Sequence, residues 1–188
     1  FVIGFFFFFR PQMSCPQMSP PETVDYVDLA RYTGLWYQIA SYINPNIGDL
    51  AGVTAEYTAN QDGTVKVVNK GLVDGLDGTP VMIEGVARVV DEETNAKLSV
   101  TFDRPELEGI EFPYWIIELD EDYQWAVVTN DTRFVLYILS RTSTMDDAVY
   151  EDILYRVVQK GFEADRIELT PQLEECSIDV LQGTVLRS

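Results

Sequence analysis

Short stretches in which apolar and polar residues alternate recur along most of this chain, and clusters of Gly, Asn and Asp separate them. In one stretch, Leu98, Val100 and Phe102 alternate with Ser, Thr and Asp. This alternation is typical of a β-strand with one buried face. Because most connections are as short as hairpin loops, we expect consecutive strands to pair antiparallel. The eight predicted strands cover residues 35–42, 52–59, 64–71, 81–90, 97–103, 113–119, 124–129 and 134–140.

One helical pattern follows the predicted strands. Val149, Ile153 and Val157 recur at helical spacing, and capping residues precede them from Ser143 onward. Gly161 stands where a helix often ends in a left-handed residue. The pattern therefore predicts a helix over about residues 145–160.

The helix is expected to cover part of the sheet. Residues 113–119 and 135–139 are apolar on both strand faces, so their outer faces need cover. A short last strand is predicted at 166–169. The predicted fold is all-β, an eight-stranded antiparallel up-and-down β-barrel (a calyx) with one C-terminal α-helix packed outside, because closure removes exposed sheet edges.

The length of 188 residues favours a single domain, which we place at residues 23–172. Residues 1–22 begin with a Phe-rich stretch that is too short to span a bilayer and continue into a Pro-rich segment. We expect these residues to lie outside the fold as an apolar leader and tail, and residues 173–188 to form a C-terminal tail.

Two cysteines lie near opposite ends of the chain, Cys15 and Cys176. Their spacing matches no metal-binding motif, so we expect no metal site. Three states stay open from the sequence: two free thiols, one disulfide between the two tails, or lipidation of Cys15. The residues before Cys15 fit a lipidation motif poorly.

Charge and composition exclude several functions. The chain has 31 acidic and 13 basic residues, a formal net charge of −18, and no histidine. A phosphate backbone is bound by clustered Lys and Arg, so we expect no nucleic-acid partner. The lack of histidine excludes Ser-His-Asp and Cys-His catalysis, and no carboxylate pair falls on an inward position. We therefore expect no enzyme activity and no cofactor.

Four segments in order carry a family resemblance. Gly34-Leu35-Trp36 opens the first strand, and matching segments follow at 54–71, 114–128 and 137–142. Together they span about residues 25–172 and resemble the lipocalin family, in the branch of apolipoprotein D, bacterial lipocalins and temperature-induced lipocalins. The resemblance implies a short turn of helix before the first strand and a barrel that encloses a small hydrophobic ligand.

By this resemblance, Gly34, Trp36 and Arg141 close one end of the barrel. Trp36 is a large flat plug whose N–H needs a partner, and Gly34 allows a close approach of the backbone. Arg141 is expected to stack on the indole and donate to nearby carbonyls. We expect all three to serve the fold rather than chemistry.

Strand alternation, counted from Trp36 and from the apolar stripes, predicts which side chains point into the barrel. A β-bulge would reverse the prediction for the residues that follow it. Small residues among aromatic ones favour a cavity over a filled interior. Polar groups such as Tyr57, Tyr137 and Asn69 are expected to orient a head group. The predicted ligand-contacting residues are Ala55, Tyr57, Val67, Ala87, Leu98, Val100, Phe102, Trp115 and Tyr137.

Two functions remain open from the sequence. The first is binding of one small hydrophobic partner, such as a fatty acid, lysophospholipid or pigment-like molecule, for transport, storage or membrane protection. The alternative is a structural or regulatory subunit of a larger, membrane-associated assembly. Export to a periplasm, the exterior or an organelle lumen is expected, and any peripheral membrane contact would use the loop from Ile43 to Leu50 because the negative charge disfavours anionic lipid.

Overall fold

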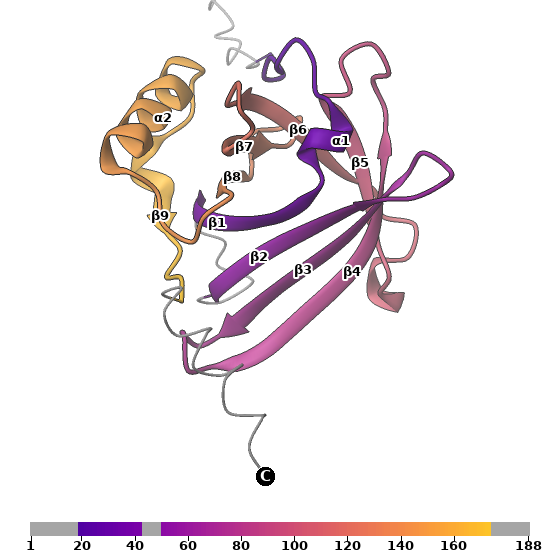
Figure 1. Ribbon diagram of the computed structural model, residues 1–188, viewed down its shortest axis with the longest axis horizontal. Coiled ribbons are helices and arrows are strands. Elements are labelled where there is room, and N and C mark those ends of the chain that lie inside the picture. Colours follow the sequence, from indigo (N-terminus) through magenta and orange to yellow (C-terminus); the bar gives the residue numbers. More distant parts are fainter. Residues whose placement is uncertain (1–18, 43–49, 174–188) are drawn as a thin grey trace, which may run out of the picture.

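The computed structural model describes residues 19–42 and 50–173, which form a closed antiparallel barrel (Figure 1). The strands follow one another around the barrel in sequence order, and β1 closes the circle by pairing with both β8 and β2. The predicted eight-stranded up-and-down barrel with one C-terminal helix outside is confirmed. The strands are β1 Gly34–Tyr42, β2 Leu50–Ala59, β3 Val65–Val73, β4 Thr79–Val89, β5 Lys97–Phe102, β6 Phe112–Leu119, β7 Trp125–Thr129, β8 Leu136–Ser140 and β9 Ile167–Leu169.

The helices are short except for one. α1 spans Leu29–Tyr32, and α2 spans Asp147–Gln159. Two 3₁₀ turns, η1 Pro105–Leu107 and η2 Ala164–Arg166, lie in connections. None of the helices in residues 19–42 and 50–173 combines the length and apolar character needed to cross a membrane.

The ninth strand completes the seam of the barrel. β1 pairs with β2 near its start, and its last residues pair with β9. Beyond β9, the carbonyl of Pro171 accepts from Gly52 N at 2.7 Å, and Gln172 Nε2 donates to the carbonyls of Gln38 and Val53 at 2.8 and 3.0 Å. The chain that follows the helix therefore fills the space between the diverging ends of β1 and β2.

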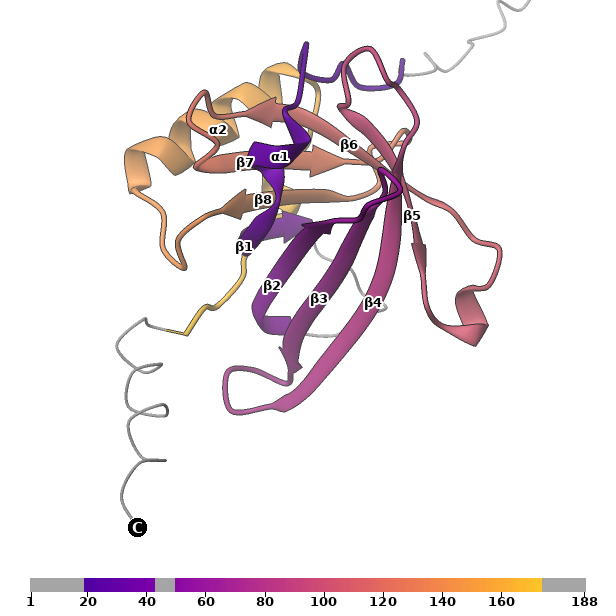
Figure 2. The ribbon, with the colours of Figure 1, turned by 45° about the vertical axis from the view of Figure 1, so that its right-hand side comes forward.

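Two separate apolar clusters follow from this arrangement. The interior cluster lies inside the barrel and includes Trp36, Tyr57 and Leu98. The helix-side cluster lies between the barrel wall and α2, where Ile153 and Val157 are fully buried. Figures 1 and 2 show α2 along the outside of the barrel, on the side away from β3 and β4. Strands that are apolar on both faces are the ones that contribute to both clusters.

A β-bulge in β6 serves the helix contact. The pairing with β7 shifts between Ile116 and Glu118, so Ile117 joins the helix-side cluster and Glu118 also faces α2. Glu118 is mostly buried and pairs with Lys160 at 3.1 Å and Arg156 at 3.6 Å. These ion pairs hold the last turn of α2 to the sheet.

The helix begins two residues later than the sequence pattern predicts. Asp146 is the N-cap, and its carboxylate accepts from the backbone N–H groups of Ala148 and Val149 at 2.9 and 3.3 Å. Gly161 follows the helix with φ +85°, as expected for a left-handed residue at this position.

Residues 19–22 differ from their expected place outside the fold. Pro21 is buried, and the carbonyl of Ser19 accepts from the guanidinium of Arg133 at 3.1 Å. Further along, Val24 N donates to the Ile116 carbonyl and Val27 N to the Thr94 carbonyl, at 3.0 and 2.8 Å. The strand-like segment before α1 therefore packs on the barrel, a contact that alternation does not reveal because the segment is short and contains prolines.

Replacing the helix cap tests the contribution of α2. We expect Asp146→Ala to lower the free energy of unfolding by about 1 kcal/mol, because two backbone N–H groups lose their acceptor. Glu151→Ala, at an exposed position of the same helix, should change it by less than about 0.5 kcal/mol. Urea unfolding followed by circular dichroism measures both, and equal losses would contradict the assigned cap.

Candidate functional site: the barrel interior

One end of the barrel is closed by a stacked pair of side chains. Trp36 is fully buried, and its Nε1 donates to the carbonyl of Tyr32 at 2.8 Å. The guanidinium carbon of Arg141 lies 3.7 Å from the centre of the Trp36 ring. Since the indole N–H has its partner and the ring has its cation, the plug is complete.

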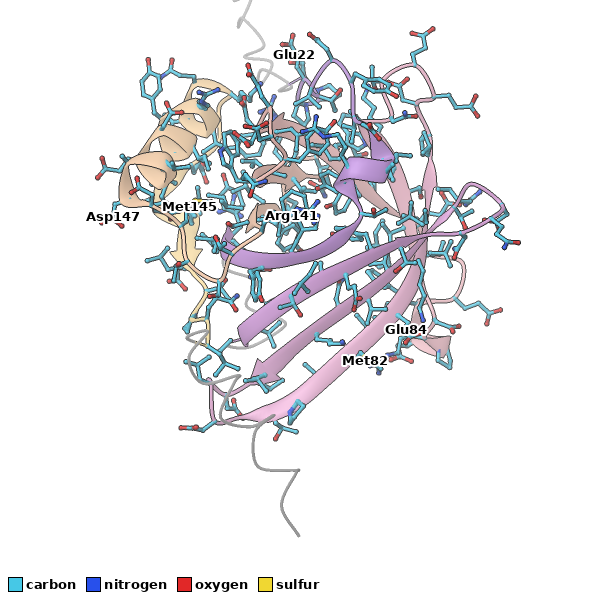
Figure 3. The ribbon with its side chains drawn as sticks, in the orientation of Figure 1. Glu22, Met82, Glu84, Arg141, Met145 and Asp147 are labelled. Carbon is cyan, nitrogen blue, oxygen red and sulfur yellow. The ribbon has the colours of Figure 1, made fainter. Side chains whose placement is uncertain are left out.

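Arg141, which is labelled in Figure 3, also joins three chain segments at this end. It donates to the carbonyls of Leu35 at 2.9 Å, Arg31 at 2.7 Å and Tyr123 at 3.2 Å, which belong to β1, α1 and the β6–β7 loop. Gly34 permits this approach, because its φ is +96° and a Cβ there would lie 3.4 Å from Arg141 Nη1. The structure thus brings Gly34, Trp36 and Arg141 together.

Replacing Arg141 with lysine keeps the positive charge but removes the guanidinium that stacks on Trp36 and binds three carbonyls. We expect Arg141→Lys to lower the free energy of unfolding by about 2 kcal/mol, because an ammonium cannot serve three carbonyls and the indole face at once. Arg31→Lys is the matched control, since Arg31 stacks on Tyr123 at 4.1 Å at the surface. The free energy of unfolding of Arg31→Lys should fall by less than about 0.5 kcal/mol. Chemical denaturation measures the free energy of unfolding of both variants. Equal losses in Arg141→Lys and Arg31→Lys would show that the stacking and carbonyl contacts of Arg141 add no stability.

Next to this plug the barrel contains a small, partly open cavity of about 60 Å³. Its walls are almost entirely apolar or aromatic. Leu29 and Tyr32 of α1 line the end of the cavity that lies next to the plug. The lining residues are Leu29, Tyr32, Thr33, Tyr57, Val65, Val67, Asn69, Ala87, Leu98, Val100, Phe102 and Tyr114.

Most of the predicted ligand-contacting residues face this cavity. Tyr57, Val67, Ala87, Leu98, Val100 and Phe102 line it. Ala55 and Tyr137 pack against the interior cluster without lining the cavity. Ala55 lies beside Trp36 in the pairing of β1 with β2, which places it at the level of the plug.

Trp115 does not point inward, so its predicted orientation is wrong. It pairs with Lys97 across β5 and β6, and the ammonium of Lys97 lies 4.8 Å from its ring centre on the outer face. The inward residue is its neighbour Tyr114, which pairs with Leu98. Because residues 113–119 are apolar on both faces, alternation could not distinguish the two registers.

Sequence reasoning also missed several lining residues. Leu29, Tyr32 and Thr33 come from α1 and its C-cap, where no strand alternation applies. Val65 shares the inward side of β3 with Val67 and Asn69, so its position could have been found from the same alternation.

Three tyrosines form a hydrogen-bonded chain in the cavity wall; Tyr32 and Tyr57 are buried and Tyr114 is partly buried. Tyr114 Oη lies 2.8 Å from Tyr32 Oη and 3.0 Å from Tyr57 Oη. The rings of Tyr32 and Tyr57 stack with centres 5.8 Å apart, and those of Tyr57 and Tyr114 meet edge to face at 6.1 Å. Burial raises the pKa of Tyr57 to about 12 and that of Tyr114 well above its ordinary value. All three hydroxyls are therefore neutral over the physiological pH range.

These pKa shifts predict a loss of stability at high pH. A tyrosine whose folded pKa exceeds its unfolded pKa of about 10 stabilises the fold below pH 10, and this contribution is lost as the pH rises through the folded pKa. We expect the free energy of unfolding to fall between about pH 10 and pH 12, by up to about 1.4 kcal/mol per pH unit for each titrating tyrosine.

Tyr57→Phe should weaken this pH dependence, because it removes one titrating group with a pKa of about 12. Tyr155→Phe is the control, since Tyr155 is 65% exposed on α2. Urea unfolding at several alkaline pH values, together with tyrosinate absorbance, provides the measurement. An unchanged slope in Tyr57→Phe would contradict the assignment.

The described residues offer little for metal or acid–base chemistry. No group of three or more Cys, Asp and Glu side chains that could hold a metal ion occurs in residues 19–42 and 50–173. Cys15 and Cys176, the tentative disulfide, lie outside the described residues, as does most of the loop expected to contact a membrane. The interior therefore offers apolar walls and neutral hydroxyl and amide groups, which suit binding.

Comparison with known proteins agrees with this geometry. Residues 27–172 match the family described as "Lipocalin-like domain". The chain is 35% identical over 158 residues to temperature-induced lipocalin-1 of Arabidopsis thaliana, covering 80% of this chain and 82% of the relative. It is also 35% identical over 157 residues to the outer membrane lipoprotein Blc of Escherichia coli K12, covering 82% and 86%. The chain belongs to the lipocalin family.

Solved structures with lower identity share the fold. Insecticyanin of the tobacco hornworm Manduca sexta superposes with a TM-score of 0.67 at 18% identity, covering 87% of this chain and 88% of the other. Lobster apocrustacyanin A1 gives a TM-score of 0.63 at 20% identity, covering 89% and 98%. At these identities the likeness concerns the barrel, and ligand identity does not follow from it.

Proposed function

We propose that this protein binds one slender hydrophobic molecule inside the barrel, for transport, storage or membrane protection. The observation that carries the proposal is a small, partly open apolar cavity next to the Trp36–Arg141 plug. Burial of an apolar chain is favourable by about 25 cal/mol per Å² of surface, so such walls favour an apolar guest. The family membership supports the same function.

The size of the cavity favours a narrow ligand. Its volume of about 60 Å³ is small against the roughly 300–1,000 Å³ of most ligand pockets. A single alkyl or polyene chain needs the least displacement of wall side chains, whereas a fused-ring pigment would require the strands to separate. Among the ligand classes expected from the sequence, a single-chain lipid therefore fits better than a pigment-like molecule.

Some relatives carry names that agree with a lipid-related role outside the cytoplasm. One is named an outer membrane lipoprotein, and another, which is 26% identical over 149 residues, is named retinol-binding protein 4 of Rattus norvegicus. We propose an exported, membrane-peripheral protein that takes up its ligand through the open end of the barrel.

Binding of diphenylhexatriene, a slender fluorescent hydrocarbon without a head group, tests the proposal. We expect one site with a dissociation constant in the micromolar range, read from the rise in probe fluorescence, because a buried chain of this size supplies about 8 kcal/mol. Ala87→Leu should weaken binding at least about tenfold, since the added carbons occupy cavity volume. Ala87 is 4% exposed and lines the cavity.

Val86→Leu is the matched control, because Val86 is the adjacent residue of β4 with its side chain outside and 38% exposed. It should leave binding within about twofold of the wild type. Circular dichroism confirms that both variants keep the barrel. If the wild type fails to bind the probe, the binding function is wrong, and a role as a structural subunit becomes the better explanation.

A further inference from the structure

The tyrosine chain contains one more proton than its hydrogen bonds use. Tyr32, Tyr57 and Tyr114 supply three O–H groups, and they are joined by two hydrogen bonds. Whatever the direction of the chain, one O–H is left to donate, and no other group in residues 19–42 and 50–173 accepts from these hydroxyls. All three tyrosines line the cavity, so the remaining donor is available to a molecule inside it.

A residue with an unsatisfied acceptor lines the same cavity. Asn69 Oδ1 is buried, and no group of the described residues donates to it. Asn69 lies on the inward side of β3, on the same side as Val67, which pairs with Tyr57. A buried carbonyl oxygen without a donor destabilises the protein, and a ligand that donates to it relieves this cost. The residues that line the cavity thus include one free donor and one free acceptor.

No charged side chain lines this cavity. The guanidinium of Arg141 lies beneath Tyr32 and Trp36, where its donors are directed at backbone carbonyls. A carboxylate brought into the cavity would lose its hydration without gaining a free cation, which is strongly unfavourable. It would also offer no proton to Asn69 Oδ1.

We propose that the cavity selects ligands with a neutral hydroxyl head group, which enters first while the hydrocarbon chain extends toward the open end. This inference rests on the proposed function. A hydroxyl accepts from the tyrosine chain and donates to Asn69, so it satisfies both groups at once. The ligand class is therefore the long-chain alcohols, in preference to fatty-acid anions.

A set of molecules with one chain length and different head groups tests the selection. Decanol donates and accepts, methyl decyl ether only accepts, and decanoate at about pH 8 is an anion that only accepts. Each is titrated into the protein loaded with diphenylhexatriene. We expect the concentration of decanol that displaces half of the probe to be about tenfold lower than the corresponding concentration of the ether. The concentration of decanoate should be higher than that of the ether.

Asn69→Leu tests whether Asn69 accepts the hydrogen bond that the ligand hydroxyl donates. In this variant the ether should compete as well as decanol does, because the acceptor is gone. Tyr114→Phe leaves Tyr32 and Tyr57 each with a free O–H and leaves Asn69 in place, so it should keep the advantage of decanol over the ether. Lys70→Leu is the control, since the neighbouring Lys70 is exposed and pairs with Glu56 at 3.8 Å; it should keep the wild-type preference.

The outcomes separate this inference from the function on which it rests. If diphenylhexatriene binds but decanoate or the ether displaces it as well as decanol does, the head-group selection is wrong and the binding function stands. The same holds if Asn69→Leu keeps the wild-type preference for decanol over the ether. If diphenylhexatriene does not bind to the wild type, both proposals fail.

Discussion

The stacking of Arg141 on Trp36 determines the geometry of the whole barrel interior. Without Arg141, one face of the Trp36 ring would lack its cation, and the carbonyls of α1, β1 and the β6–β7 loop would lack donors. Arg141 meets these needs together, with its guanidinium carbon 3.7 Å from the ring centre and bonds to three segments. The barrel is consequently closed at this end, its floor, by contacts that join three chain segments.

The floor also explains why polar groups can lie deep in an apolar cavity. Tyr32 belongs to α1, and its position is fixed because its carbonyl accepts from both Trp36 and Arg141. From there its hydroxyl reaches Tyr114 across the barrel. A chain of neutral hydroxyls is tolerated in such surroundings when its members bond to one another, while an isolated charge is not. The cavity is therefore polar at selected points and uncharged throughout its lining.

The sequence predicted the barrel because alternation and turn residues act locally. The strands of residues 65–102 have one apolar face each, and their inward residues Val67, Ala87, Leu98 and Val100 were correctly placed. The prediction failed at Trp115, because β6 is apolar on both faces and its register is set by partners in β5. The family resemblance located Gly34 and Arg141, whereas physical reasoning alone gave only the need for a plug.

Other features depend on contacts that no local pattern records. The tyrosine chain joins α1, β2 and β6, which are distant in sequence, and the missing partner of Asn69 is visible only once the strands are assembled. Bulges between Gln38 and Ala40 and between Ile116 and Glu118 direct extra residues toward α2. The cavity volume follows from all of these packing details together, and for that reason the sequence indicated a cavity without its size.

A crystal structure with decanol brominated at its terminal carbon would test most directly whether the interior holds a ligand with its head group on the floor. Anomalous scattering locates the bromine without ambiguity between the two ends of the chain. The account predicts the bromine near Phe102 toward the open end, and the hydroxyl oxygen within hydrogen-bond distance of Asn69 Oδ1 and a tyrosine hydroxyl. Bromine at the floor beside Tyr32, or a ligand bound only outside the barrel, would contradict it.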